Sequence, residues 1–540
     1  MNQTTLIRCL DGLTVLLLGL LITVVVTGGW TVSVGAWQFH LTRPENAFLA
    51  VLPVLALRWG LRPPALPRIP PRWALAGGIT AYTATFAFIT VTSHYALHTG
   101  FDLGYYVQLL WNLVEGHGPQ VSLPEMHAWG DHFSPILYLF VPLFILFPSA
   151  VYLLITQSMA LALGAPVVFT LARRWLGDDK QALALAGLYL LNPSVHGINL
   201  KDFHPQALAI PLLLAAIAAF ESRRPFWFML SVLLTLGTRE DAGLAILGLG
   251  LWLGVARRRW LWGLWVGALG LAWVFFTTSW LIPFFREAPY PHLGRFAHLG
   301  GSLGEILLAL LQQPLAPLAA LATGDRFIYV LALLAPVGFL PLLRPLDLLP
   351  ALPTLVVNLL SSDPLLVHHR WQYVAYIVPF LFTATITGLG RLRERSAEPR
   401  RGRLAALNPR RALGLALVLS LALTSRTLNY FPVARWALTD WQHAVYRLMA
   451  RVPPGVGVST HTYLIPHLAL RSKVFIFPVG LERSDYVLLY PRAHHSDKLV
   501  TREGKMVSVQ AGEILHHYVV VTEEVGYLLL RRLPAETIRR

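Results

Sequence analysis

The chain has 540 residues, of which 55% are hydrophobic and only 13% are charged, and its formal net charge is +16. A mean hydropathy of +0.55 excludes an ordinary soluble protein and indicates a polytopic membrane protein. The basic residues are concentrated in short loops between apolar windows, a pattern typical of membrane topology rather than of nucleic-acid binding. With the single cysteine Cys9, the chain cannot form an intrachain disulfide framework.

A helix that spans a membrane needs roughly 20 apolar residues, and the apolar windows of this sequence predict about 13 transmembrane helices. The predicted spans are residues 12–26, 46–57, 73–91, 152–171, 182–191, 207–220, 226–236, 244–255, 261–282, 327–343, 348–360, 374–389 and 413–423. Lys and Arg are retained on the cytoplasmic side of a membrane, which predicts that the loops rich in them are cytoplasmic. These loops carry Arg58, Arg62, Arg68 and Arg72 after the second span, and the most basic of them is 391–411.

Three segments between the spans are predicted to lie at the outer interface. Residues 103–114 repeat apolar side chains at helical spacing and predict a short amphipathic helix lying in the interface. Residues 136–147 are broken by proline and predict a re-entrant or interfacial hairpin, which other helices must bury. Residues 304–322 are a further outer interfacial segment.

The last part of the chain has a different texture. Residues 429–540 contain alternating runs such as KVFIFPV, DYVLLYP and HYVVVTEEVGYLLLRR, which predict a small α/β domain. The predicted fold is therefore an all-α polytopic membrane bundle with a small extracytoplasmic α/β domain at its C-terminal end. Its parts are a two-helix extension (1–72), a transmembrane domain with a large first outer loop at 92–150 (73–428), and the α/β domain (429–540).

A long span without Lys or Arg is predicted to face outward. Residues 73–172 contain neither, yet hold four carboxylates, at Asp102, Glu115, Glu125 and Asp131. All 19 His fall in segments assigned to the outside or its boundary, although the map was drawn from Lys and Arg alone. We therefore expect the protein to be a multi-pass protein of the inner or plasma membrane, with its functional face and α/β domain outside.

Five polar clusters are predicted to converge on this outer face. They are Asp102; Asp131 with His132; Lys201, Asp202 and His204; Arg239, Glu240 and Asp241; and His368, His369 and Arg370. Ionisable groups near membrane depth are costly to bury and tend to mark function. A carboxylate that takes a proton, beside Lys and Arg that hold a phosphate, suits transfer from a lipid-phosphate donor. In this reading Asp102 is the base, and Arg239 and Arg370 contact the phosphate.

The carboxylates and histidines also have other interpretations, some of them purely structural. Asp102 follows Gly100 and could serve as a helix N-cap, and Asp131 with His132 could cap the segment that follows them. Asp202 and His204 could bind a divalent metal together with Asp131 or His132, because carboxylate and imidazole suit Zn or Mn. Alternatively, Asp202 could form an ion pair with Lys201.

The two basic clusters have structural readings as well. Arg239, Glu240 and Asp241 could be a buried network that locks two short helices together. His368, His369 and Arg370 could fix the start of a span at the membrane interface.

The blocks FDLGYYVQLLWN, GDHFSP, DFHPQ and REDA resemble the signature blocks of a family of prokaryotic polytopic membrane proteins catalogued as a domain of unknown function. That family is similar in layout to the C-type (GT-C) glycosyltransferases, which include protein mannosyltransferases and the aminoarabinose transferases of lipid A. The resemblance is carried by about residues 101–285, and it extends to the rest of the chain by layout only.

The resemblance implies a role for one residue. In GT-C enzymes an acidic residue early in the first large outer loop acts as the base or positions the acceptor, which corresponds to Asp102 here. Their donors are polyprenyl-phosphate sugars. Two features depart from the pattern: two predicted spans precede the one that leads into the loop, and Gln206 stands where the related block has Glu. Gln206 is therefore not expected to act as an acid.

The expected function is transfer of a sugar from a polyprenyl-phosphate carrier to a lipid, glycan or protein acceptor at the outer face. Membrane lipids are the other expected partners, and nucleic acid is not. A transporter or lipid flippase is the competing class, although it predicts internally repeated halves, and no duplication is visible in the sequence. A non-catalytic assembly protein, whose last domain recruits partners, is a third possibility. No Walker-type glycine loop occurs, so ATP hydrolysis is not expected in this chain.

Overall fold

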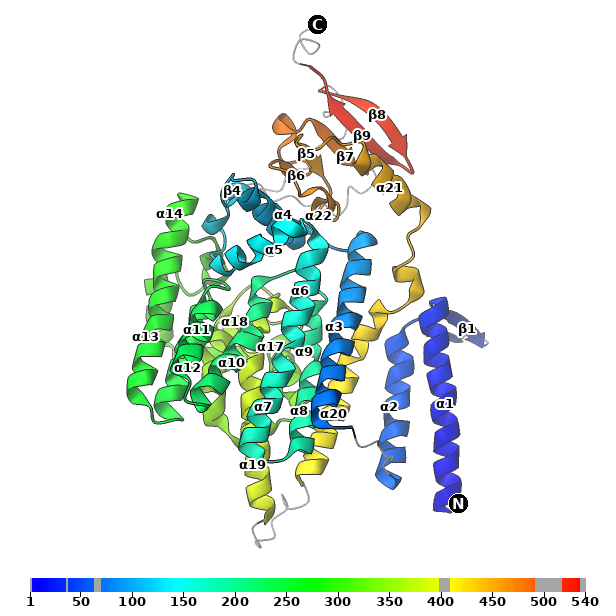
Figure 1. The fold of residues 1–540 in the computed structure, drawn as a ribbon, viewed down its shortest axis with the longest axis vertical. Coiled ribbons are helices and arrows are strands. Elements are labelled where there is room, and N and C mark those ends of the chain that lie inside the picture. The colour runs from blue at the N-terminus through cyan, green and yellow to red at the C-terminus, as the bar shows by residue number, and fades with distance from the viewer. Residues whose placement is uncertain (1, 35–36, 63–68, 398–407, 491–516, 535–540) are drawn as a thin grey trace.

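The computed structural model describes residues 2–34, 37–62, 69–397, 408–490 and 517–534. A bundle of helices forms its body, and a five-stranded sheet with its helix α21 stands at one end (Figure 1). We call this the sheet end, and the opposite end, where the chain begins, the arginine end. Arg68, residues 398–407 of the most basic loop, and residues 491–516 and 535–540 of the expected α/β domain lie outside the described residues.

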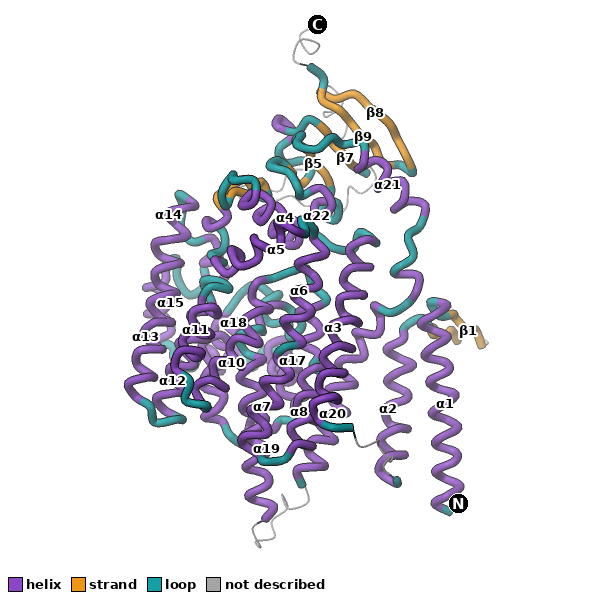
Figure 2. Tube along the Cα trace, in the orientation of Figure 1, coloured by secondary structure: helices purple, strands orange, loops and turns teal. Residues whose placement is uncertain are grey.

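The N-terminal segment is a pair of helices beside the bundle. Helix α1 (Gln3–Thr27) and helix α2 (Pro44–Leu61) pack against each other, as expected from the first two apolar windows. A hairpin of β1 (Trp30–Val34) and β2 (Trp37–Leu41) joins them at the end nearer the sheet (Figure 2). This hairpin was not predicted, although residues 30–34 and 37–41 are rich in β-branched and aromatic residues.

Helices connected by short loops build the bundle. Their bounds are α3 (Pro71–Tyr95), α6 (Ala150–Ala162), α7 (Gly164–Leu176), α8 (Asp179–Leu190), α9 (Pro193–Asn199), α10 (Ala209–Glu221), α11 (Pro225–Leu236), α12 (Ala242–Val255), α13 (Trp260–Phe276), α14 (Ile282–Arg286), α15 (Leu303–Gln312), α16 (Ala316–Ala320), α17 (Gly324–Leu334), α18 (Leu352–Leu360), α19 (Val378–Ala397) and α20 (Pro409–Thr424). Most of the predicted spans correspond to one of these helices.

Five helical stretches of the described chain are long and apolar enough to cross a membrane. They are Gln3–Thr27, Pro71–Tyr95, Ala150–Leu176, Trp260–Arg286 and Pro409–Tyr430. The remaining apolar helices are shorter than a bilayer requires when taken alone, so the expected number of about 13 spans stays a prediction.

Proline breaks one of the predicted spans. Residues 327–343 were expected to form a single helix, but α17 ends at Leu334, and the 3₁₀ turns η6 (Ala335–Val337) and η7 (Leu340–Leu343) follow it. Pro336 and Pro341 lie in these turns. Proline has no backbone N–H and clashes with the preceding turn of a helix, so the α-helix cannot continue through them.

Glycines allow α12 and α13 to pack at backbone contact. A Cβ atom added at Gly243, Gly250 or Gly263 would collide with the backbone of the opposite helix. Small residues let helices approach closely in this way in membrane proteins. On its other side α13 exposes Trp260, Leu261 and Trp265, with 65–75% of each residue accessible, as expected for a surface that faces lipid.

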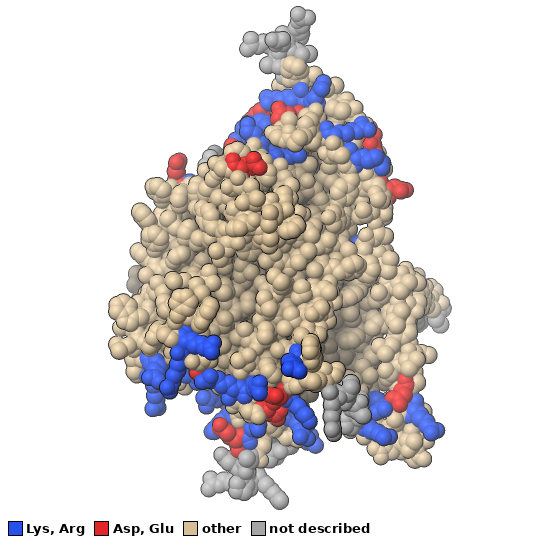
Figure 3. All heavy atoms as spheres, in the orientation of Figure 1, with Lys and Arg blue, Asp and Glu red and all other residues tan. Residues whose placement is uncertain are grey.

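Charge is distributed as a membrane protein requires. Lys and Arg gather at the arginine end and again around the sheet, and a wide band nearly free of charge separates the two regions (Figure 3). The connections α10–α11 and α12–α13 contribute Arg223, Arg224 and residues 257–259 to the arginine end. Assignment of this end to the cytoplasmic side stays a prediction.

The first large loop folds over the sheet end of the bundle. It contains α4 (Phe101–Val114), the hairpin of β3 (Gln120–Ser122) and β4 (Glu125–His127), the 3₁₀ turns η1 (Ala128–Gly130) and η2 (Pro135–Phe140), and α5 (Val141–Leu146). Helix α4 ends at the predicted residue and begins two residues earlier than predicted, but it does not lie in the interface with one face toward lipid. Residues 103–110 are buried on every side, because α22 (Ile465–Leu468) covers the face turned away from the bundle.

The C-terminal segment forms a small α/β unit, as predicted. Helix α21 (Asp440–Ala450) precedes β5 (Val458–Thr460), β6 (Val474–Ile476), β7 (Tyr486–Leu489), β8 (Tyr518–Glu524) and β9 (Tyr527–Arg532). The strand order is β6-β5-β7-β9-β8, with β5 parallel to β6 and β7 and the other pairs antiparallel.

Buried hydrogen bonds join this unit to α4. Gln108 Nε2 donates to Ser122 Oγ at 2.8 Å and to the carbonyl oxygens of Arg471 and Ser472 at 3.1 Å each. Ser122 Oγ also accepts from Val474 N at 3.0 Å. The unit is therefore docked on the first loop through side chains of both α4 and β3.

Candidate functional site

A distant carboxylate caps the start of α4. Asp202 Oδ2 accepts hydrogen bonds from Gly100 N at 3.0 Å and from Leu103 N at 3.3 Å. The first N–H groups of a helix have no partner within it, and here a residue about a hundred positions later supplies one. The N-cap position is Gly100, which has no side chain for this task, and Asp102 sits in the first turn. Asp102 is thus not the cap, and its carboxylate is directed elsewhere.

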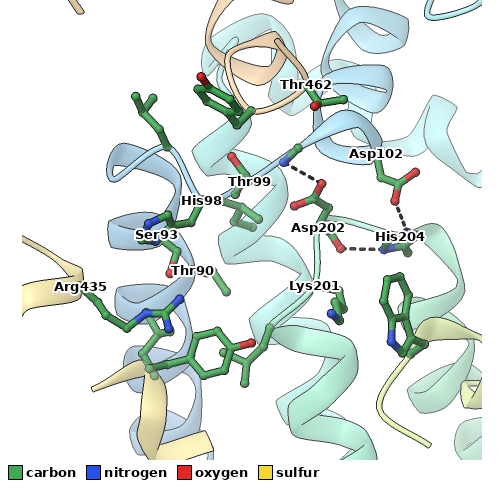
Figure 4. A pocket seen from close by; sticks show the side chains of 18 residues that line it. Thr90, Ser93, His98, Thr99, Asp102, Lys201, Asp202, His204, Arg435 and Thr462 are labelled. Atoms are coloured by element: carbon green, nitrogen blue, oxygen red, sulfur yellow. Dashed lines mark hydrogen bonds and ion pairs between the residues drawn. The ribbon is translucent and has the colours of Figure 1, made fainter. Parts of the chain in front are cut away.

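Asp102 instead faces His204. Asp102 Oδ2 lies 3.3 Å from His204 Nε2, and His204 Nδ1 is 2.7 Å from the carbonyl oxygen of Asp202 (Figure 4). If Nδ1 carries the proton and donates it to that carbonyl, Nε2 is left free to exchange a proton with Asp102. The imidazole is buried, with 5% of the side chain exposed, whereas 45% of the Asp102 side chain is accessible.

The accessible side of Asp102 opens into a cavity of about 400 Å³. Two cations line the same cavity, and each stands against an aromatic ring. Lys201 Nζ lies 4.0 Å from the ring centre of Trp371, and Arg435 Cζ lies 4.9 Å from that of Tyr430. Within the described part of the chain, neither cation has a carboxylate within ion-pair distance, so both are available to an anion.

Neighbouring charges give the two carboxylates different pKa values. Burial acts to raise the pKa of Asp102, but the contact with His204 and the charges of His204 and His132 outweigh it and lower that pKa. Burial and the charge of Asp102 raise the pKa of Asp202 to about 6, against the effects of His204 and two backbone N–H groups. Burial and the charge of Arg370 lower the pKa of Lys201. Asp102 is therefore ionised at neutral pH, whereas Asp202 gains or loses its proton at a pH of about 6.

A second group of ionisable side chains lies beside the cavity, around Glu240. Glu240 is fully buried and accepts hydrogen bonds from Phe133 N at 3.1 Å and from Tyr290 OH at 3.0 Å. Its Oε1 lies 2.9 Å from His132 Nδ1 and 3.2 Å from Arg239 Nε. Together these contacts hold the first loop against the connection between α11 and α12.

Arg239 does not line the cavity that holds Asp102. Its Nε lies 3.2 Å from Glu240 Oε1 and 3.5 Å from Asp241 Oδ1, and only 5% of its side chain is exposed. The arrangement corresponds to the second reading of this cluster, a buried network between two short helices. The five predicted clusters therefore form two neighbouring groups rather than one hollow. The groups remain in electrostatic contact, because Asp131 and His132 act on the pKa of Asp102.

The predicted cluster of His368, His369 and Arg370 lies behind Lys201. Arg370 is 8% exposed, its Nη2 donates to Thr427 Oγ1 at 3.4 Å, and its Nη1 has no partner among the described residues. The rings of His368 and His369 stack on each other with centroids 5.5 Å apart. Arg370 therefore acts on the cavity through its charge, and it is not a wall residue.

The expected metal ligands do not gather at His204. Its Nδ1 is held by a backbone carbonyl, its Nε2 faces Asp102, and the Asp202 carboxylate accepts two backbone hydrogen bonds. A group with the composition of a metal site is found instead at Asp131 and His132, with His292 from the turn η5 (Pro291–Phe296).

Sequence reasoning missed Arg435 and Tyr290 as well as His292. Arg435 lies in the turn η12 (Val433–Arg435), in a stretch that was assigned to the C-terminal domain. His292 and Tyr290 lie in the outer loop after α14. The one available signal was the combination of His, Tyr and Arg in a loop already assigned to the outer face.

The fold and the site define a class: an integral membrane helix bundle with a carboxylate, histidine and cation cavity at the end that carries an α/β unit. The chain belongs to the family described as "Predicted membrane protein (DUF2079)", whose model matches residues 93–529. The family expected from the four sequence blocks is thereby confirmed. No curated protein matches the chain by sequence.

Solved membrane-protein structures are similar to the chain at low identity. One is ArnT from Cupriavidus metallidurans bound to undecaprenyl phosphate, with 13% identity and a TM-score of 0.49, covering 85% of this chain and 98% of that one. Apo ArnT gives 13% identity and a TM-score of 0.45, covering 84% and 98%. The apo Archaeoglobus fulgidus oligosaccharyltransferase gives 13% identity and a TM-score of 0.39, covering 76% and 69%.

Proposed function

We propose that the protein is a membrane glycosyltransferase that moves a sugar from a polyprenyl-phosphate carrier to an acceptor at the sheet end. One observation carries the proposal: an accessible carboxylate, Asp102, shares one cavity with two cations that have no carboxylate partner among the described residues. Such a cavity offers a proton acceptor for the nucleophile and counter-charges for a leaving phosphate.

Each cavity residue has a role in this reaction. Asp102 accepts a hydrogen bond from the acceptor's hydroxyl group and takes its proton as the oxygen attacks the anomeric carbon of the sugar. The bond between that carbon and the phosphate oxygen breaks, and the polyprenyl phosphate leaves with the electron pair. Lys201 and Arg435 stabilise its negative charge. His204 holds the Asp102 carboxylate and can receive the proton at Nε2.

An apolar cavity of about 460 Å³ supports a lipid-linked donor. It is lined by α2, α3, α8, α20 and the turn η11 (Ser425–Tyr430), and its walls are almost wholly hydrocarbon. It lies along the same seam as the polar cavity: Phe86 of α3 lines the apolar one, and Ile89, one turn further, lines the polar one. A lipid tail in the apolar cavity would bring its phosphate toward Lys201 and Arg435.

Binding of the carrier tests the proposal without knowledge of the sugar. The full chain in lipid nanodiscs should bind a polyprenyl phosphate, detected by native mass spectrometry. The double variant Lys201→Met with Arg435→Met should lose most of this binding, because the phosphate loses both counter-charges. The matched control is Lys473→Met with Arg451→Met, which removes two exposed cations at the sheet end but outside the cavity.

Two results would overturn the proposal. One is equal carrier binding by both double variants. The other is transport of the carrier lipid across sealed proteoliposomes that persists in a folded Asp102→Asn variant. The latter would favour the flippase reading, in which Asp102 has no chemical step to perform.

A further inference from the structure

Three side chains from two distant segments meet beside the Asp102 cavity. Asp131 and His132 follow the turn η1, and His292 belongs to η5, some 160 residues later in the chain. One possible ligand atom from each residue lies within 4.8 Å of those from the other two. The rings of His132 and His292 are nearly parallel, with centroids 4.5 Å apart and an interplanar angle of 11°. The fold thus brings two imidazoles and a carboxylate to one point.

Glu240 fixes the orientation of His132. Its Oε1 lies 2.9 Å from His132 Nδ1, and Tyr290 OH and Phe133 N hold the same carboxylate from other sides. With Nδ1–H donated to Glu240, His132 presents the lone pair of Nε2 away from the network. Metal-binding histidines are usually oriented in this way, by a carboxylate on the nitrogen that does not bind the metal.

His292 places a buried nitrogen atom near Asp131. Its Nε2 is buried, has no hydrogen-bond partner among the described residues, and lies 3.5 Å from Asp131 Oδ1. That separation exceeds the 2.7–3.2 Å range of a good hydrogen bond, and it suits two ligands of one ion better. The three side chains remain 18–23% exposed, so an ion could still reach them.

The local charge favours a cation. Three carboxylates stand here, Asp131, Glu240 and Asp241, and Arg239 pairs with the last two. Two further guanidinium groups lie near, but Arg295 is paired with Asp363, and Arg286 donates to the carbonyl oxygen of Gly130. Buried carboxylates in excess of their partners are costly unless a cation neutralises them.

We propose that Asp131, His132 and His292 form a site for a divalent transition-metal ion, with zinc the best match. Two nitrogen ligands and one oxygen ligand are the donor set of many zinc sites with three protein ligands and one open position. The inference does not rest on the proposed glycosyl transfer. If both are true, the ion stands next to the Asp102 cavity, where Asp131 and His132 already act on Asp102.

The test measures metal alone on the full chain. Protein purified in detergent is stripped with a chelator, mixed with zinc or manganese chloride, and desalted, and bound metal per chain is determined by mass spectrometry. Wild-type protein should retain one ion, and Asp131→Asn and His292→Ala should retain none. Glu240→Gln, which removes the charge that orients His132 but none of the three ligands, should weaken zinc affinity by about 10- to 100-fold in a chelator competition.

His298→Ala provides the matched control, because His298 lies in the same loop and is exposed. It should bind metal like the wild type. The melting temperature of each metal-free variant checks folding, and His292→Gln replaces His292→Ala if the alanine variant does not fold. The site is refuted if folded Asp131→Asn and His292→Gln retain as much metal as the wild type, or if the folded wild type retains neither ion.

Discussion

Two groups of ionisable side chains lie next to each other at the sheet end, and they differ in what accompanies their cations. Around Asp102, Lys201 and Arg435 stand against aromatic rings. Around Glu240, Arg239 is enclosed by two carboxylates and a tyrosine ring. Aromatic contact leaves a cation able to bind an anion, whereas a carboxylate partner satisfies it. We infer that the first group acts on a substrate and the second stabilises the fold.

The largest expected effect is on chemistry in the first group. Asp102→Asn removes the proton acceptor but keeps the shape of the side chain, so we expect transfer to fall by about 100- to 10,000-fold. The melting temperature should change little, because Asp202 rather than Asp102 caps α4. Transfer of labelled sugar by reconstituted protein measures this. Full activity in a folded Asp102→Asn variant would contradict the inference that the first group acts on a substrate.

In the second group the expected effect is on stability. Glu240→Ala removes the buried partner of His132 and leaves Arg239 with Asp241 alone, which should cost about 3–5 kcal/mol. The measurement is a thermal unfolding curve of the purified protein. The matched control is Glu305→Ala, which removes an exposed glutamate whose carboxylate accepts a hydrogen bond from Gly301 N, just before its own helix. A melting temperature equal to that of the control would contradict the structural role.

A smaller effect, on binding of the lipid donor, is expected when Lys201 or Arg435 is replaced singly. Lys201→Met or Arg435→Met removes one charge-assisted contact, worth about 1.5–3 kcal/mol, and so raises the KM for the lipid donor by about 10- to 100-fold. kcat should change less, provided that the contact is made in the bound donor as well as in the transition state. An unchanged KM in both variants would place the phosphate elsewhere.

The smallest effect concerns pH. The pKa of Asp202 is raised from 3.8 to about 6, so between these values the folded chain binds more protons than the unfolded one. This group alone therefore makes the protein more stable as pH falls from 7 to 5. Asp202→Asn cannot titrate, and its melting temperature should lose that part of the pH dependence. Identical pH profiles for the two proteins would show that Asp202 is not buried beside a charged Asp102.

Much of the bundle could be predicted because its rules are local. Apolar windows fix helices, and arginines fix their ends, so α3, α10 and α12 were found close to their observed bounds. Hydropathy alone does not register where proline ends a helix, so it predicts one helix over residues 327–343 where the structure has α17 and two 3₁₀ turns. The burial of α4 could not be foreseen, since the cover comes from α22, more than 350 residues later.

The candidate site was predictable in membership but not in arrangement. Asp102, Lys201 and His204 were identified as polar residues expected at one face. Whether a cation has a carboxylate partner depends on the folded arrangement, so residue spacing does not predict it. Trp371 contacts Lys201, whereas Glu240 pairs with Arg239. Arg435 comes from a short turn with no motif of its own.

The hydrogen bonds of Gln108 have a consequence for the α/β unit. Because this amide reaches the backbone at Arg471 and Ser472 from a helix of the first loop, the unit is not a detachable accessory. A protein cut before α21 would leave Gly104 and its neighbours on α4 uncovered, and the Gln108 amide would keep its bonds to Ser122 but lose those to Arg471 and Ser472. The segment 465–474 must then be docked on α4 before the cavity loop has its final form, so the cavity is finished only after that segment has been made.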